Sequence, residues 1–191
     1  MILEEYKSIL EKRLSNRRYA HSLNVSKEAQ ILAKRYGADE EKALIAGLLH
    51  DIMKDTASDE QAKFLCKYGV KLTPIELASK KLWHAISGEQ YLKNELGIED
   101  KDILNAVRFH TTGRENMSLL EKVIFIADFT SEDRDYNGVE NMRKASEQSL
   151  EEAMLEGLSF TIQDLASRKL LIDENTMKAY NQIVLKQKGD F

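Results

Sequence analysis

The chain has four histidines, and each lies in or beside an apolar segment: His21, His50, His84 and His110. Asp51 follows His50 directly, and the apolar run Val123–Ala127 leads into Asp128. A buried imidazole needs hydrogen-bonding partners, and burying a carboxylate costs far more free energy. Four histidines and two aspartates brought into one core therefore make chemical sense as ligands of a divalent metal.

The types of donor atom narrow the choice of metal. Imidazole nitrogen suits Zn, Cu, Fe and Ni, whereas carboxylate oxygen suits harder cations. A mixed His and Asp set without thiolate points to iron or manganese and away from a closed structural zinc site. We expect a divalent transition metal, iron first, with manganese, cobalt and nickel as alternatives, and we leave a second metal open. Each histidine alone is more often an ordinary core residue, so the joint pattern carries this hypothesis.

The elements that must position these residues are helices. The 191 residues are 42% hydrophobic and 31% charged, with one proline and nine glycines. A β-sandwich or barrel would need many more turn-forming residues. Apolar residues recur at helical spacing from end to end, and no segment alternates cleanly enough for a strand. The sequence predicts an all-α bundle of about nine to eleven helices in a single domain over residues 1–191.

Capping signals mark several expected helix ends. Asn16 and Asp39 are expected to open two helices, and Gly37 to end the first of them. The segment Thr73–Glu76 reads as a capping box with proline at the first helical position. Ser118–Glu121 reads as a second capping box.

Three further helical stretches follow from the periodicity alone. The helix that opens at Thr73 is expected to end near Trp83 and His84, and the next to run from about Ser87 to Leu96. Helical periodicity then covers about 139–168 as one stretch. A break at Leu170–Glu174 precedes a last helix over about 176–186.

Charge and hydropathy exclude several classes of partner. The net charge is −4, with no basic stripe, so a nucleic-acid partner is not expected. No apolar run approaches the length of a membrane span, and the N-terminus does not resemble a signal peptide. We expect a cytoplasmic protein with no membrane partner.

The order of His21, the pair His50-Asp51 and Asp128 resembles the signature of the HD-domain metal phosphohydrolases, an all-α family. The closer resemblance, over nearly the whole chain, is to bacterial HD-domain hydrolases that split diadenosine tetraphosphate symmetrically into two ADP. The stretches that carry it are Arg18–His21, Ala46–Lys54, Leu82–His84, His110–Gly113, Phe125–Asp128, Arg134 and, in the tail, Ile172, Thr176 and Asn181.

The resemblance implies a metal site and a catalytic set. The implied metal ligands are His21, His50, Asp51 and Asp128, and the implied catalytic residues are Asp51, His84 and His110. Such a metal keeps positions open for water and a phosphate oxygen and lowers the pKa of that water. His84 and His110 could hold a second metal with Asp51 bridging, or they could contact the substrate and protonate the leaving group. We favour substrate contact.

The resemblance also implies a nucleotide site. Lys54 lies one helical turn after Asp51, and Arg134 can grip phosphate bidentately. The alternatives are ion pairs of Lys54 with Asp55 or Asp59, and of Arg134 with Asp133 or Asp135. The implied substrate-binding residues are Arg18, Lys54, His84, His110, Thr111, Arg134, Leu171, Ile172, Asp173 and Thr176. On this view a metal core covers about 17–135, and C-terminal helices over about 139–187 complete the nucleotide pocket. Without the resemblance, the residues at 170–174 indicate only an ordinary turn between two helices.

One loop departs from the family's pattern. After Asp128 the family usually continues with an aromatic residue, an aliphatic residue, Glu, Pro, any residue and Arg. Here the chain reads Phe129-Thr130-Ser131-Glu132-Asp133-Arg134. Glu and Pro are replaced, whereas Arg134 keeps its place. We therefore expect the shape of this loop and the substrate preference to differ from those of the family. We expect the metal ligands to be the same.

We therefore expect a hydrolase that cleaves diadenosine tetraphosphate symmetrically to two ADP with a metal-activated water. The alternatives are an HD-type nucleotide phosphatase or phosphodiesterase, and a non-catalytic nucleotide-binding helical module. The intact set of candidate ligands argues against the last. The expected partners are the nucleotide substrate, its ADP product and a second copy of the chain in a homodimer.

Overall fold

The computed structural model describes residues 2–189, so Met1 and residues 190–191 of the expected domain lie outside it. The described chain contains eleven α-helices and one short 3-10 helix, without a strand. The helices are α1 (Ile2–Arg13), α2 (Asn16–Tyr36), α3 (Glu40–Leu49), α4 (Ser58–Lys67), α5 (Pro74–Ala78), η1 (Lys80–Leu82), α6 (Trp83–Asn94), α7 (Lys101–Phe109), α8 (Leu119–Thr130), α9 (Val139–Gln148), α10 (Leu150–Ser167) and α11 (Glu174–Lys188). The predicted all-α class and number of helices are confirmed. Within residues 2–189 no helix is both long and apolar enough to cross a membrane.

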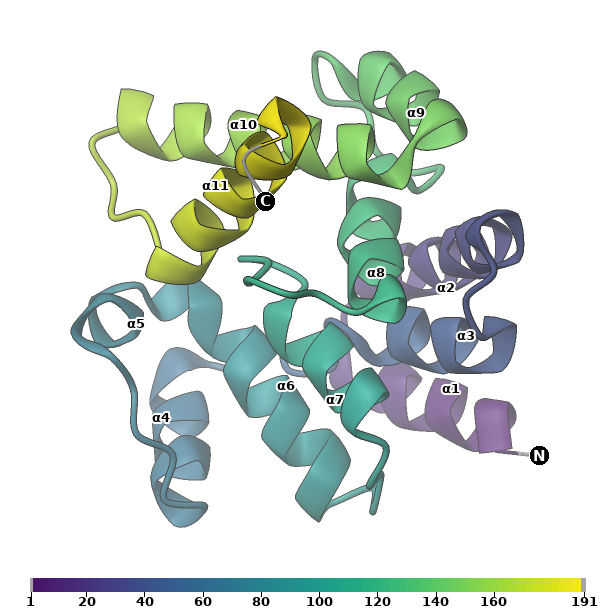
Figure 1. The fold of residues 1–191 in the computed structure, drawn as a ribbon. Helices are drawn as coiled ribbons and strands as arrows, with labels where there is room; N and C mark the ends of the chain where they lie inside the picture. The colour runs from purple at the N-terminus through teal and green to yellow at the C-terminus, as the bar shows by residue number, and fades with distance from the viewer. Residues whose placement is uncertain (1, 190–191) are drawn as a thin grey trace.

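Helix α8 is the central element of the bundle. It packs against α2 and α3 on one side and against α7, α9 and α10 on others (Figure 1). Its segment Val123–Ala127 is completely buried. A helix that is apolar on all sides is stable only when neighbours cover all of it. Asp128 directly follows the buried segment. The packing of α8 therefore fixes its position near the ends of neighbouring helices.

A glycine allows α2 and α3 to pack closely. A Cβ atom on Gly47 of α3 would lie 2.9 Å from the Cα of Ser26 and 3.0 Å from the carbonyl oxygen of Val25, both on α2. Contacts that short with backbone atoms leave no room for any side chain. The close approach brings His21 of α2 near His50, the residue that ends α3.

Most of the predicted caps are confirmed. Gly37 has a φ of 78° after α2, Asp39 accepts from Lys42 N–H at the start of α3, and Thr73 and Glu76 form a complete capping box. The N-cap of α2 is Ser15 rather than Asn16. Ser118 caps α8, but hydrogen bonds between Arg114 and the Glu121 carboxylate, at 2.7 and 2.5 Å, take the place of the second half of the box.

The helix that opens at Thr73 is shorter than the sequence predicts. It ends at Ala78, because Ser79 has φ −106° and ψ 72°, and a 3-10 turn follows. The indole N–H of Trp83 donates to the carbonyl of Glu76 at 2.7 Å, which folds the chain back on itself. A new helix, α6, therefore starts at Trp83, and His84 lies in its first turn rather than at the end of the preceding helix.

The stretch over 139–168 is two helices, not one. Ser149 has extended backbone angles, φ −153° and ψ 131°, and its hydroxyl accepts from Glu152 N–H at 3.3 Å as the N-cap of α10. A serine followed three residues later by glutamate is an ordinary helix-start signal. The continuous apolar periodicity concealed it in the sequence.

Candidate metal centre

The four histidines and two aspartates meet in one cluster. Their potential ligand atoms form three overlapping groups, each within 4.8 Å: His21 with His50 and Asp51, His50 with His110 and Asp128, and Asp51 with His84 and His110. The six residues come from α2, the turn after α3, α6, the turn after α7, and α8. All four histidines and Asp51 are buried, and Asp128 is half-buried. The predicted convergence of these residues is therefore present in the structure.

Asp51 lies at the middle of the cluster, and its two oxygens face different residues. Oδ2 is 3.6 Å from His50 Nε2. Oδ1 is 3.2 Å from His84 Nε2 and 3.5 Å from His110 Nε2. We call the part formed by His21, His50 and Asp128 the Asp128 side, and the part formed by His84 and His110 the His84 side. Asp51 joins the two sides as a bridging carboxylate would.

Three histidines share one hydrogen-bonding arrangement. The Nδ1 atoms of His50, His84 and His110 each lie 2.7 Å from the carbonyl oxygen three residues earlier in the chain. A carbonyl can only accept, so Nδ1 carries the proton in each ring. Each Nε2 then directs a lone pair into the cluster. This is the usual arrangement of histidines that bind metals.

His21 has a different partner for its Nδ1, and both of its ring nitrogens face carboxylates. Its Nδ1 donates to Asp133 Oδ2 at 2.7 Å, and its Nε2 lies 3.0 Å from Asp128 Oδ1. Asn24 donates to the other oxygen of Asp133 at 3.2 Å. From the sequence, Asp133 was expected only as a partner of Arg134. The one feature of the sequence that could have indicated this contact is the carboxylate of Asp133 inside the loop that departs from the family pattern.

The donor atoms of the cluster fit a divalent cation. Nε2 of His50 and Oδ1 of Asp51 are buried and form no hydrogen bond within residues 2–189. His84 Nε2 and His110 Nε2 lie 3.2 Å apart, and with their protons on Nδ1 both atoms are acceptors. Orphaned acceptors of this kind are costly in a protein interior. A cation among them supplies the missing partner.

The protonation states suit metal binding as well. Burial lowers the pKa of His50 to about 3, against the opposite pull of Asp51 and Asp128. Burial would raise the pKa of Asp51, but the surrounding histidines and Lys54 hold it well below its usual value. Metal ligands must be neutral imidazoles and ionised carboxylates. His50 and Asp51 are held in those states. Burial would lower the pKa of His21, but its hydrogen bond with Asp128 raises that pKa, so a metal at its Nε2 would displace a proton.

Three cations border the cluster. Lys54 Nζ is 3.0 Å from His84 Nε2 and 3.4 Å from Asp51 Oδ1, and Arg18 Nη1 is 3.4 Å from Asp51 Oδ2. Arg134 donates to the Asp128 carbonyl at 2.6 Å and also pairs with the carboxylate of Asp128. The pairs that the sequence offered as alternatives, with Asp55, Asp59, Asp133 or Asp135, are replaced by pairs with the cluster's own aspartates.

The other predicted substrate-binding residues lie around the loop after His110 and at the start of α11. The Thr111 hydroxyl is buried and has no hydrogen-bond partner in the described part of the chain. Leu171 is exposed, Ile172 is half-buried and Thr176 is buried. The buried Asp173 caps α11 by accepting from Asn175 N–H at 2.9 Å. The hydrogen bonds and ion pairs of residues 2–189 do not join Leu171–Thr176 directly to the six clustered residues.

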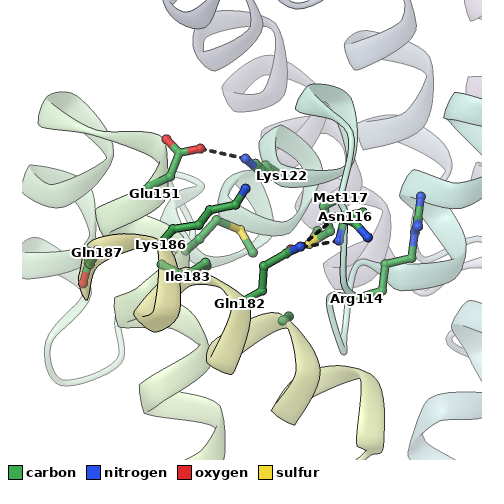
Figure 2. Close-up of a pocket in the computed structure, with 11 residues that line it drawn as sticks. Arg114, Asn116, Met117, Lys122, Glu151, Gln182, Ile183, Lys186 and Gln187 are labelled. Carbon is green, nitrogen blue, oxygen red and sulfur yellow. Dashed lines mark hydrogen bonds and ion pairs between the residues drawn. The ribbon is translucent and has the colours of Figure 1, made fainter. Parts of the chain in front are cut away.

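A separate pocket of about 190 Å³ lies between this loop, α10 and α11 (Figure 2). Its lining contains none of the six clustered residues. Two hydrogen bonds, of 2.9 and 2.6 Å, tie Asn116 to Gln182 of α11 along its edge. A Cβ on Gly113 would lie 3.4 Å from the Cβ of Ala179. The loop that begins at Thr111 is therefore held against α11.

The fold and the donor set define an all-α hydrolase class, and comparison with known proteins identifies it. Residues 18–133 match the family described as HD domain. The chain belongs to the HD-domain family.

Full-length relatives place the chain within that family. It is 40% identical to "Bis(5'-nucleosyl)-tetraphosphatase, symmetrical" of Halalkalibacterium halodurans, over 94% of this chain and 96% of that protein. The protein of the same name from Bacillus subtilis is 35% identical over 95% and 97%. A solved structure, described as a predicted HD superfamily hydrolase involved in NAD metabolism from Clostridium acetobutylicum, matches with a TM-score of 0.93. It is 37% identical and covers 96% of this chain and 97% of that one. The predicted family resemblance is confirmed.

Proposed function

We propose that this chain is a metal-dependent hydrolase that splits diadenosine tetraphosphate in the middle and releases two ADP. The observation that carries the proposal is the buried Asp51, whose two oxygens face two groups of histidines. The full-length similarity to proteins named symmetrical tetraphosphatases selects the substrate and the position of the cut. It favours this function over a phosphatase, a phosphodiesterase or a non-catalytic module.

The proposed metal ligands are the Asp128 side, His21, His50 and Asp128, together with the bridging Asp51. The His84 side offers two more nitrogens and Oδ1 of Asp51 to a second ion or to a phosphate. A divalent ion supplies a lower pKa for water and positive charge for a phosphoryl oxygen. Iron is the proposed metal, with manganese, cobalt and nickel as alternatives, because the donors are nitrogen and oxygen.

The residues around the metal would orient the substrate. Lys54, Arg18 and Arg134 would exchange some of their present contacts with Asp51 and Asp128 for contacts with phosphate oxygens. Positioning and charge neutralisation dominate the catalysis of phosphoryl transfer, so these cations suit the reaction. Nε2 of His84 or His110, an acceptor in the resting chain, would take up the proton released from water and pass it to the leaving oxygen.

The proposed reaction balances as a single hydrolysis. The water oxygen forms a bond to one of the two inner phosphorus atoms. The bond from that phosphorus to the central bridging oxygen breaks, and this oxygen leaves with the second ADP. One proton is released from water to the surrounding groups, and no oxidant or reductant takes part.

The nucleoside pocket is proposed between Thr111 and the segment Leu171–Thr176. The contacts between the loop after His110 and α11 support this placement, because they hold the two segments together. The division into a metal core over 17–135 and C-terminal helices over 139–187 stays a prediction. A cytoplasmic location and a homodimer stay predictions as well.

The test combines metal analysis with product identification. The purified chain, loaded in turn with iron and with manganese, is incubated with diadenosine tetraphosphate, and the products are separated by chromatography. We expect ADP alone, and no products after treatment with a chelator. Equal amounts of ATP and AMP would place the cut asymmetrically and contradict the proposal.

A further inference from the structure

His21 differs from the other three histidines in where it lies on its helix. His50 and His110 end their helices, and His84 is in the first turn of α6, so each finds a carbonyl three residues earlier for Nδ1. His21 lies within α2, where backbone N–H groups four residues ahead already occupy the carbonyls. Its Nδ1 therefore needs an acceptor from another part of the chain.

That acceptor comes from a loop far away in the sequence. Asp133, 112 residues after His21, accepts from Nδ1 at 2.7 Å. The Asp133 side chain is 34% exposed, and Asn24 is its other hydrogen-bonding neighbour in the described chain. A carboxylate on the surface, held by so few contacts, keeps its position only if the main chain beneath it is fixed.

One side chain fixes that main chain. Arg143 of α9 donates from Nε to the carbonyl of Thr130 at 3.1 Å. Its Nη2 donates to the carbonyls of Ser131 at 2.9 Å and Arg134 at 3.0 Å. The first two carbonyls belong to the end of α8, where helix geometry leaves carbonyls without partners and a positive charge is favourable. Arg143 thus holds both ends of the segment that carries Asp133.

We propose that Arg143 is a positioning residue of the metal centre, acting through loop 130–134, which it holds so that Asp133 orients His21 and Arg134 contacts Asp128. The inference rests on the proposed function, because it requires a metal at His21. The loop is the one in which this chain lacks the family's proline. Without proline one backbone angle of the loop is freer, and the hydrogen bonds from Arg143 restrict the loop.

The test measures the affinity of the metal-free chain for Mn²⁺ by competition with a chelating dye. Arg143→Met and Asp133→Ala are each expected to weaken binding about 10-fold or more, the range for losing a partner that orients a ligand. Arg143→Lys retains the charge and part of the hydrogen bonding, so it should restore some of the loss. Because both residues act through one contact, the double variant should lose much less than the product of the two losses.

Arg35 provides the matched control. It donates to the carbonyl of Ser146, also on α9, at 3.1 Å, but the hydrogen bonds described for it do not reach loop 130–134. Arg35→Met therefore removes an arginine–carbonyl contact of α9 while leaving the loop held. Its Mn²⁺ affinity should stay within about twofold of the unchanged chain, whatever its effect on thermal stability.

A spectroscopic measurement separates positioning from general destabilisation. Nitrogen-15 shifts of the imidazoles in the metal-free chain report which ring nitrogen carries the proton. We expect the Nδ1 signal of His21 to shift in Asp133→Ala and in Arg143→Met, because the hydrogen bond to Asp133 is lost or loosened, whereas the Nδ1 signals of His50 and His110 stay in place. If the chain without any substitution binds no Mn²⁺, the proposed metal centre is overturned. If that chain binds Mn²⁺ and Arg143→Met changes neither the affinity nor the His21 signals, only the role of Arg143 is overturned.

Discussion

The two sides of Asp51 differ in charge. The Asp128 side has a second carboxylate, Asp128, next to His21 and His50, and Arg134 pairs with this carboxylate at its edge. The His84 side has two histidines, and the nearby charge is the ammonium of Lys54, 3.0 Å from His84 Nε2. Two carboxylates attract a divalent cation strongly, whereas an ammonium repels it and attracts phosphate. One continuous cluster thus contains a part suited to a tightly held metal and a part suited to an anion.

Asp51 belongs to both sides, so its loss should have the largest effect. We expect Asp51→Asn to lower kcat for diadenosine tetraphosphate by about 10³-fold or more, because the ligand charge and the link between the sides disappear together. Steady-state kinetics and metal analysis of the purified variant check this. The control is Asp55→Asn, which removes an exposed carboxylate that accepts from Ser15. Substantial turnover by Asp51→Asn would contradict the shared role.

A paired substitution tests the difference between the sides directly. Asp128→Asn should weaken Mn²⁺ binding by about 100-fold, because it removes a carboxylate from the Asp128 side. His84→Gln should leave the tightly bound metal in place and raise KM. The measurements are dye competition for the metal and initial rates for KM. If both variants lose the metal equally, the two sides are equivalent and the comparison fails.

Two glycines allow the helix packing of the two sides to be compared. A Cβ on Gly47 would meet the α2 backbone at 2.9 Å, whereas a Cβ on Gly88 of α6 would meet the Val107 side chain of α7 at 3.3 Å. Gly47→Ala should lower the free energy of unfolding by about 2 kcal/mol through overpacking. Gly88→Ala should change it by less than about 1 kcal/mol, because helix propensity gains offset a small shift of Val107. Thermal and urea unfolding of both variants decide. Equal losses would show that the two helix pairs are packed equally tightly.

Substitution of Lys54 should have the smallest effect of these changes. Lys54→Met is expected to raise KM about 10-fold, or 1.4 kcal/mol, through the loss of one charge-assisted contact with phosphate. The tightly bound metal should stay unchanged, since Lys54 lies on the His84 side. Lys63→Met, an exposed lysine on α4, is the control and should leave KM unaltered. An unchanged KM in Lys54→Met would show that this ammonium serves only Asp51 and His84.

The sequence predicted what depends on local chemistry. Caps such as Asp39 and the box at Thr73 act over three or four residues, and apolar periodicity marks the helices that carry the histidines. The predictions failed at Ser79 and Ser149, where a break in the backbone interrupts a continuous apolar pattern. Ser79 breaks the helix where Trp83 folds back onto Glu76, and Ser149 caps a new helix through its own hydroxyl.

The candidate site was predictable where residue types mattered and not where the path of the chain mattered. The six clustered residues follow from type and family resemblance. The contact of Asp133 with His21 spans 112 residues and depends on the course of a loop. Arg134 pairs back with Asp128, six residues earlier, rather than with its neighbours Asp133 or Asp135, because the loop turns its side chain toward the end of α8.

The residues of the candidate metal centre are far apart along the chain, and this affects when the centre can form during synthesis of the protein. His21 and Asp128 are 107 residues apart, and Asp133 lies further on. A chain made from its N-terminus presents His21 and His50 long before the residues that complete the donor set. If these residues hold the metal as proposed, strong metal binding waits until α8 and its loop have emerged and docked on α2. A metal that binds the folded form alone then adds about 1.4 kcal/mol to the stability of the finished protein for each tenfold excess over its Kd.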